Sequence, residues 1–167
     1  MTPAELLKDA FGRIVESGTA VVDGLTDDQL TERVHPEANT IAWLVWHLTR
    51  VQDDHIADVA GTEQVWTAQG FADRFDLPFK DGATGYGMSS DEVGQVRVSA
   101  DLLTAYLQAT HRATLAYLDT VADGDLDRIV DDRWDPPVTL GVRLVSVVND
   151  DTQHVGQAAY ARGLLDT

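Results

Sequence analysis

Apolar residues recur every three or four positions along four long stretches of the chain, a spacing typical of helices with one buried face. Asn39 or Thr40 suits the N-cap of the second stretch, Gly61 suits its end, and Ser99 or Ala100 suits the start of the third. The pattern predicts helices over residues 3–24, 40–60, 100–122 and 140–165.

The segments between these helices carry turn-forming residues and little periodicity. In the longest, residues 61–98, we expect a short helix over residues 69–75 and a loop with three glycines over residues 80–89. Shorter turns are expected at residues 26–30 and near Ser90, and residues 123–137 form a polar connection. No strand and no internal repeat is predicted. The pattern indicates an all-α fold, one four-helix bundle domain over residues 1–167 with an irregular segment between its second and third helices.

Composition narrows the classes of function. The chain has 28 acidic and 12 basic residues, a formal net charge of −16, and no basic block, so nucleic acid and anionic membrane are poor partners. No apolar run reaches the roughly 18 to 20 residues of a membrane span. The first residues lack the basic start and the apolar block of a signal peptide. We therefore expect a cytoplasmic protein.

The chain contains no cysteine. Disulfides, thiolate metal sites and a cysteine nucleophile are therefore excluded. A metal ion would have to bind His, Asp or Glu side chains, and any thiol chemistry would need a thiol supplied by a second molecule.

The strongest candidate for chemistry is a set of two histidines and one carboxylate on two of the predicted helices. His47 lies on the apolar stripe of the second helix, between Leu44 and Val51. Asp150 and His154 are four residues apart on the fourth helix, so they share a face and lie about 6 Å apart along its axis. Such a set leaves coordination positions open, as a catalytic metal requires. His47, Asp150 and His154 are therefore the candidate metal ligands.

Spacing by itself leaves alternatives open. A hydrogen bond between Asp150 and His154 without any metal fits the same spacing. His55 also lies on the apolar stripe, and in an up-down-up-down bundle the second and fourth helices are parallel. Counting from the start of each helix then places His154 level with His55 rather than His47. Asp151, three residues from His154, competes with Asp150 for the carboxylate position.

Other polar and aromatic residues are expected to be structural. Asp53 and Asp54 are expected on a solvated turn of helix. The four tryptophans are expected to pack, with Trp134 as a further candidate for a pocket wall. Surface salt bridges are expected for three arginines that could also receive an anionic group, Arg50, Arg143 and Arg162. Structural or exposed positions are expected for two histidines, His35 and His111.

Three stretches resemble the DinB/YfiT-like superfamily of four-helix metalloproteins: residues 43–54 (WLVWHLTRVQDD), 134–142 (WDPPVTLGV) and 150–163 (DDTQHVGQAAYARG). The resemblance extends over essentially the whole chain. It is strongest to the branch with mycothiol- and bacillithiol-dependent S-transferases and the N-terminal domain of mycothiol-dependent maleylpyruvate isomerase. In this family a histidine before Leu-x-Arg binds metal together with a His or Glu four residues before a histidine of the last helix. The resemblance implies His47, Asp150 and His154 as ligands, in preference to His55.

Two positions depart from the family pattern. Asp150 is one methylene shorter than the Glu that is usual in this branch, so its helix must lie closer to a metal ion. Gln157 stands where many relatives have another histidine, so that position offers no fourth nitrogen ligand.

The resemblance implies a metal-dependent thiol S-transferase. A divalent metal, Zn²⁺ with Ni²⁺ or Fe²⁺ as alternatives, would lower the pKa of mycothiol or a similar small thiol, and the thiolate would attack an electrophile. Lys8 and Lys80 are the only lysines, a usage typical of GC-rich genomes, which favours mycothiol over bacillithiol. The family also suggests a homodimer. Two alternatives are a non-catalytic metal- or ligand-binding, stress-related bundle and a metal-dependent hydrolase that uses water in place of the thiol.

Overall fold

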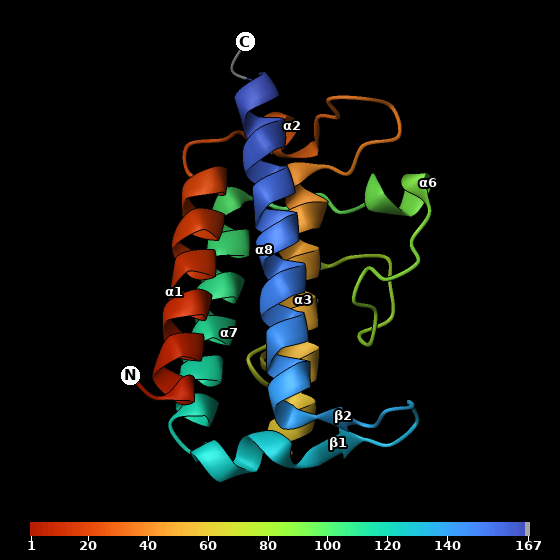
Figure 1. Ribbon diagram of the computed structural model, residues 1–167. Coiled ribbons are helices and arrows are strands. Elements are labelled where there is room, and N and C mark those ends of the chain that lie inside the picture. The colour runs from red at the N-terminus through yellow and green to blue at the C-terminus, as the bar shows by residue number, and fades with distance from the viewer. Residues whose placement is uncertain (166–167) are drawn as a thin grey trace.

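Four long helices lie side by side in the computed structural model, which describes residues 1–165 (Figure 1). They are α1 (Pro3–Val22), α3 (Ile41–Ala60), α7 (Ala100–Leu118) and α8 (Leu140–Leu165). Helices α1 and α3 each pack against both α7 and α8. The shorter elements are α2 (Asp27–Thr31), α4 (Val65–Ala68), α5 (Phe71–Phe75), α6 (Ser90–Val93), the 3₁₀ helix η1 (Asp123–Asp127), β1 (Ile129–Asp131) and β2 (Val138–Thr139). The predicted all-α bundle is confirmed.

Local contacts set the helix ends close to where the sequence predicts them. Thr40 Oγ1 accepts a hydrogen bond from the backbone N–H of Trp43 at 3.1 Å, so Thr40 rather than Asn39 is the N-cap of α3. Gly61 ends α3 with a φ of 66°, a left-handed conformation that suits glycine. Ser99 caps α7 in the same way as Thr40 caps α3. Helices α1 and α7 end somewhat before their predicted limits near residues 24 and 122.

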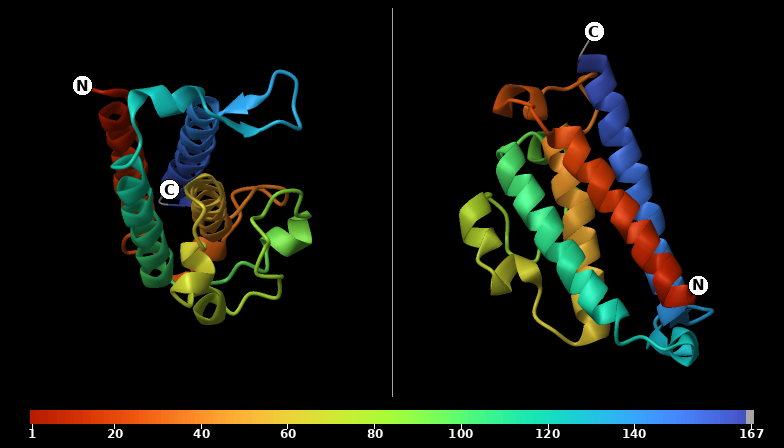
Figure 2. Two further views of the ribbon diagram at one scale, coloured as in Figure 1. Left: turned by 90° about the horizontal axis from the view of Figure 1, so that it is seen from below. Right: turned by 90° about the vertical axis from the view of Figure 1, so that its left-hand side faces the viewer.

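The helix directions differ from the up-down-up-down order expected from the sequence. In Figure 1, α1 and α8 rise toward the top while α3 and α7 descend, and the side view in Figure 2 agrees. Helices α3 and α7 are therefore parallel and are joined by a long crossover, residues 61–99, that contains α4, α5 and α6. Helices α3 and α8 are antiparallel. Their relative direction determines which residues of α3 face each turn of α8.

A two-stranded hairpin occupies part of the segment in which no strand was predicted. Strands β1 and β2 are antiparallel, with Ile129 opposite Thr139 and Asp131 opposite Val138. Between them, Arg133 donates hydrogen bonds to both carboxylate oxygens of Asp131, at 2.8 and 2.7 Å. The expectation of a strand-free chain was wrong here because strands of three and two residues are too short to show an alternating pattern.

The core fills the space between the four long helices. Its largest fully buried side chains include Trp46 and Leu48 of α3, Tyr106 and Leu107 of α7, and Phe11 of α1. Within residues 1–165, none of the helices is both long and apolar enough to cross a membrane.

Candidate metal centre

The three predicted ligands meet where α3 lies against α8. His47 comes from the second turn of α3, and Asp150 and His154 lie one turn apart in α8. One ligand atom from each residue, a ring nitrogen or a carboxylate oxygen, lies within 4.8 Å of the other two. The ring centroids of His47 and His154 are 4.7 Å apart. The antiparallel packing of α3 and α8 thus brings the three side chains together.

His47 is held in one orientation by contacts on two sides. Its Nδ1–H donates a hydrogen bond to the backbone carbonyl of Thr84 at 2.5 Å. Its ring also stacks on Trp43, with centroids 4.5 Å apart and planes 16° from parallel. Burial lowers the pKa of His47. The ring is therefore neutral near pH 7, with its proton on Nδ1 and the lone pair of Nε2 available to a metal ion.

The loop that supplies the Thr84 carbonyl lies directly against His47. Gly85 has a φ of 99°, and a Cβ atom at this position would lie 2.6 Å from His47 Nδ1 and 3.1 Å from the Trp46 ring. Glycine is therefore required both by the backbone conformation and by the lack of space.

Arg50 anchors the same loop to α3. Its Nε and Nη2 donate hydrogen bonds to the carbonyls of Ala83 and Asp81 at 3.1 and 3.0 Å, and Nη1 donates to the Gln64 side chain at 2.8 Å and to Tyr106 Oη at 3.1 Å. The side chain of Arg50 is completely buried, so the expected surface salt bridge was wrong. One signal was visible in the sequence: a charged residue amid strongly apolar helix positions needs buried partners.

Asp53 belongs to the same buried network. Its carboxylate accepts hydrogen bonds from the backbone N–H groups of Val65 and Trp66 and from Tyr106 Oη, each at 2.8 Å, and lies 3.6 Å from Arg50 Nη1. Placing Asp53 on a solvated turn was therefore wrong, whereas Asp54 is only partly buried. The network ties the start of the crossover to α3 and α7.

His154 and Asp150 interact with each other on α8. His154 Nδ1–H donates to Gln157 Oε1 at 3.1 Å, which turns Nε2 toward Asp150. His154 Nε2 and Asp150 Oδ1 are 3.6 Å apart, too far for a good hydrogen bond but close enough for a strong charge interaction. This interaction raises the pKa of His154 and lowers that of Asp150. Gln157, which provides no nitrogen ligand, thus orients the candidate ligand His154.

The donor set and its spacing fit a divalent metal. The Oδ2 atom of Asp150 is buried and has no hydrogen-bond partner among residues 1–165, a costly arrangement that a cation would relieve. If all three ligand atoms were 4.8 Å apart, their common centre would be about 2.8 Å from each, against zinc bonds of about 2.0–2.2 Å. Shifts of about 0.7 Å per side chain would therefore complete three bonds and leave the fourth position open.

The two rival ligands lie outside this group. His55 faces Arg143, whose Nη1 is 3.3 Å from the Nδ1 atom of the histidine. Counting residues favoured His55 only because it assumed parallel helices, so that count was wrong. Asp151 is fully buried, with no hydrogen-bond partner for either oxygen in the described chain, and burial together with Asp150 raises its pKa well above the usual range. That His47, Asp150 and His154 bind metal remains a prediction.

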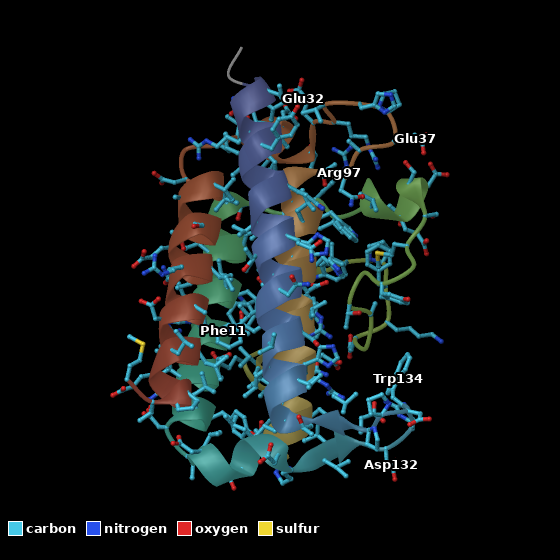
Figure 3. The ribbon with its side chains drawn as sticks, in the orientation of Figure 1. Phe11, Glu32, Glu37, Arg97, Asp132 and Trp134 are labelled. Atoms are coloured by element: carbon cyan, nitrogen blue, oxygen red, sulfur yellow. The ribbon has the colours of Figure 1, made fainter. Side chains whose placement is uncertain are left out.

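The remaining candidates from the sequence lie away from the three ligands. Trp134 is 66% exposed near the outer end of the hairpin, so the expectation that it packs was wrong, whereas the other three tryptophans are buried (Figure 3). Arg162 donates to the carbonyls of Ala20 and Val21 at the end of α1 instead of forming a surface salt bridge. Arg143 forms its expected salt bridges, but it is mostly buried. His35 is exposed, and His111 is partly buried.

A cleft of about 250 Å³ opens beside the ligands. His47 and Asp150 line it together with Val51, His55, Tyr86, Ser146 and Val147. A larger cavity of about 510 Å³ lies between α3, α4 and α7, but none of the three candidate ligands lines it. The smaller cleft is therefore the place where a molecule could meet both the metal ligands and further polar groups.

Comparison with known proteins agrees with this architecture. No curated protein matches the sequence. A crystal structure of a conserved protein from Enterococcus faecalis has a TM-score of 0.91 and 30% sequence identity, and the alignment covers 98% of this chain and 97% of that one. The model of the mycothiol-S-transferase family matches residues 6–167, nearly the whole sequence. The chain therefore belongs to the mycothiol-S-transferase family, within the DinB/YfiT-like proteins that its motifs resemble.

Proposed function

We propose that this protein is a metal-dependent thiol S-transferase, with mycothiol or a similar small thiol as co-substrate and Zn²⁺ as the favoured metal. The convergence of His47, Asp150 and His154 carries the proposal, because two histidine ring nitrogens and a carboxylate oxygen lie around one point in a chain of this family. A metal ion bound there would lower the pKa of a coordinating thiol and supply thiolate at neutral pH.

The protein's own residues prepare the site for such a reaction. Thr84 and Gln157 fix the ring orientations of His47 and His154, so little rearrangement is needed when a metal binds. The carboxylate of Asp150 offsets part of the metal's charge. The adjoining cleft of about 250 Å³ is slightly smaller than most sites for drug-sized ligands. It therefore suits a small electrophile, or the reactive end of a larger one.

Chelation followed by metal restoration tests the proposal. Purified protein would be analysed for metal, stripped with a chelator, and assayed for consumption of mycothiol with an electrophile. We expect no catalysed transfer without metal and recovery on addition of Zn²⁺, and no recovery in His47→Ala at the same zinc concentration. Full activity in protein shown to be metal-free would contradict the proposal. Conversion of the electrophile by zinc-loaded protein without any thiol would instead support a hydrolase.

A further inference from the structure

The hydrogen-bond partners of His47, His154 and His55 impose two different tautomers. The Nδ1 atoms of His47 and His154 face oxygen acceptors, the Thr84 carbonyl and Gln157 Oε1, so in the neutral rings Nδ1 carries the proton and Nε2 has a lone pair. His55 Nδ1 instead faces Nη1 of Arg143 at 3.3 Å. A guanidinium has donors and no acceptor, so His55 Nδ1 must accept and the ring proton must be on Nε2.

The surroundings of Arg143 keep this arrangement in place. Its Nη1 also lies 3.1 Å from Asp58 Oδ2, and its Nη2 lies 3.5 Å from Asp131 Oδ2, so two carboxylates hold the guanidinium. Burial lowers the pKa of His55, and the Arg143 charge lowers it further, although Asp54, Asp58 and Asp150 oppose this. His55 is therefore a neutral imidazole near pH 7 that can donate from Nε2. It is poorly suited to bind a metal, because Nε2 carries the proton and the lone pair of Nδ1 faces Arg143.

The Nε2–H of His55 is available to a ligand. The ring lines the same cleft as His47 and Asp150, and Nε2 has no hydrogen-bond partner among the described residues. Ser146, on the α8 side of the cleft, already donates its hydroxyl to the Val142 carbonyl at 2.8 Å. His55 is thus a free side-chain N–H donor beside the candidate metal ligands.

We infer that His55 donates this N–H to an oxygen of the electrophile, and that the substrates are electrophiles that gain negative charge on oxygen when sulfur adds to them. α,β-Unsaturated carbonyl compounds and epoxides belong to this class. The inference rests on the proposed function, because it assigns the electrophile for the same site.

The reaction with an α,β-unsaturated ketone illustrates the role. The thiol loses its proton to solvent, and its sulfur forms a bond to the β-carbon while the electrons of the C=C bond move to give an enolate. The enolate oxygen carries the new charge and accepts the hydrogen bond from His55 Nε2. The α-carbon then takes a proton from solvent, so the thiol and the ketone give the thioether with no other reactant. Losing one donor of this kind typically lowers the rate about 10²- to 10³-fold.

Two electrophiles separate this role from a general loss of function. Zinc-loaded full-length protein would be assayed with mycothiol and either 2-cyclohexenone, which forms an enolate, or benzyl bromide, from which bromide leaves. We expect His55→Phe to lower kcat/KM for cyclohexenone about 10²-fold and to change that for benzyl bromide less than about threefold. His55→Gln keeps an N–H donor, so its kcat/KM for cyclohexenone should be at least about tenfold higher than that of His55→Phe. His111→Phe, a partly buried histidine of α7 that does not line this cleft, serves as the control with unchanged rates.

A spectroscopic measurement adds a readout that does not depend on activity. Long-range ¹⁵N–¹H spectra of histidine-labelled protein should show the proton of His55 on Nε2 and that of His47 on Nδ1. A proton on Nδ1 of His55 would overturn the inference. Equal losses of kcat/KM for both electrophiles in His55→Phe, or no loss for either, would also overturn the inference. The proposed transferase function would stand in that case. Absence of transfer to either electrophile by zinc-loaded wild type would overturn the proposed function, and the role of His55 with it.

Discussion

Replacement of Gly85 by alanine tests whether the loop that contacts His47 supports metal binding. The new Cβ would lie 2.6 Å from His47 Nδ1 and 3.2 Å from its Cγ. Gly87, in the same loop, provides a matched control because it also has a positive φ, 74°, but has open space where a Cβ would lie. Both variants therefore introduce a left-handed alanine, and Gly85→Ala alone introduces a clash with the histidine.

The size of the effect follows from these distances. A left-handed alanine costs roughly 1–2 kcal/mol, so both variants should lose about that much free energy of unfolding. To reach an ordinary contact of about 3.4 Å, the loop in Gly85→Ala must move back by about 0.8 Å, which stretches the Thr84–His47 hydrogen bond from 2.5 Å to about 3.3 Å. Loss of such a ligand-orienting bond typically lowers metal affinity 10- to 100-fold, or about 1.4–2.8 kcal/mol.

Competition of each variant with a chromophoric chelator gives the zinc affinity, and urea unfolding of the metal-free proteins gives the stability. We expect similar stability losses in the two variants and a zinc affinity reduced 10- to 100-fold only in Gly85→Ala. Equal zinc affinities in the two variants would refute the reasoning, because the clash would then have no effect on the ligand.

Three further predictions concern the α8 side of the site. Asp150→Asn should lose tight zinc binding in the same titration while Asp151→Asn keeps it, and the reverse result would show that the carboxylate assignment is one residue out of place. Asp151→Asn should raise the free energy of unfolding of metal-free protein at neutral pH by about 1–3 kcal/mol, because burial raises the pKa of Asp151 so that its carboxyl must take up a proton on folding, which asparagine does not need; a loss of stability would contradict this. Zinc affinity should fall as the pH falls through the pKa of His154, which Asp150 raises above its usual value of about 6.5, because protons then compete with the metal. Burial lowers the pKa of His47, so protons should compete with the metal for this residue only at more acidic pH. A zinc affinity that stays unchanged between about pH 8 and pH 5.5 would contradict the predicted competition at His154.

The helix ends could be predicted because nearby residues determine them. The Thr40 cap and the left-handed Gly61 act on backbone groups within a few positions, and their residue types are visible in the sequence. Helix direction could not be predicted in this way. It depends on the crossover of residues 61–99, whose short helices and loops show no periodicity that indicates where the chain re-enters the bundle.

The site shows the same division between local and distant contacts. Stripe positions and the family resemblance identified His47, Asp150 and His154 as the group that the structure brings together. Arg50 was missed as a buried residue because its partners, the carbonyls of Asp81 and Ala83, lie about 30 positions further along the chain. Burial of a charged side chain depends on such distant partners, which helical spacing does not reveal.

The candidate metal ligands come from α3 and α8, two helices that are made at different times during synthesis of the chain. Roughly 100 residues separate His47 from His154, and at about 5–20 residues per second the ribosome needs several seconds or more to make them. During that time His47 has emerged without Asp150 and His154, and α1 and α3 lack α8, which packs against both of them. A zinc ion that reached the nascent chain would therefore find a single histidine of this site, and selection of the metal would fall to the completed, folded protein.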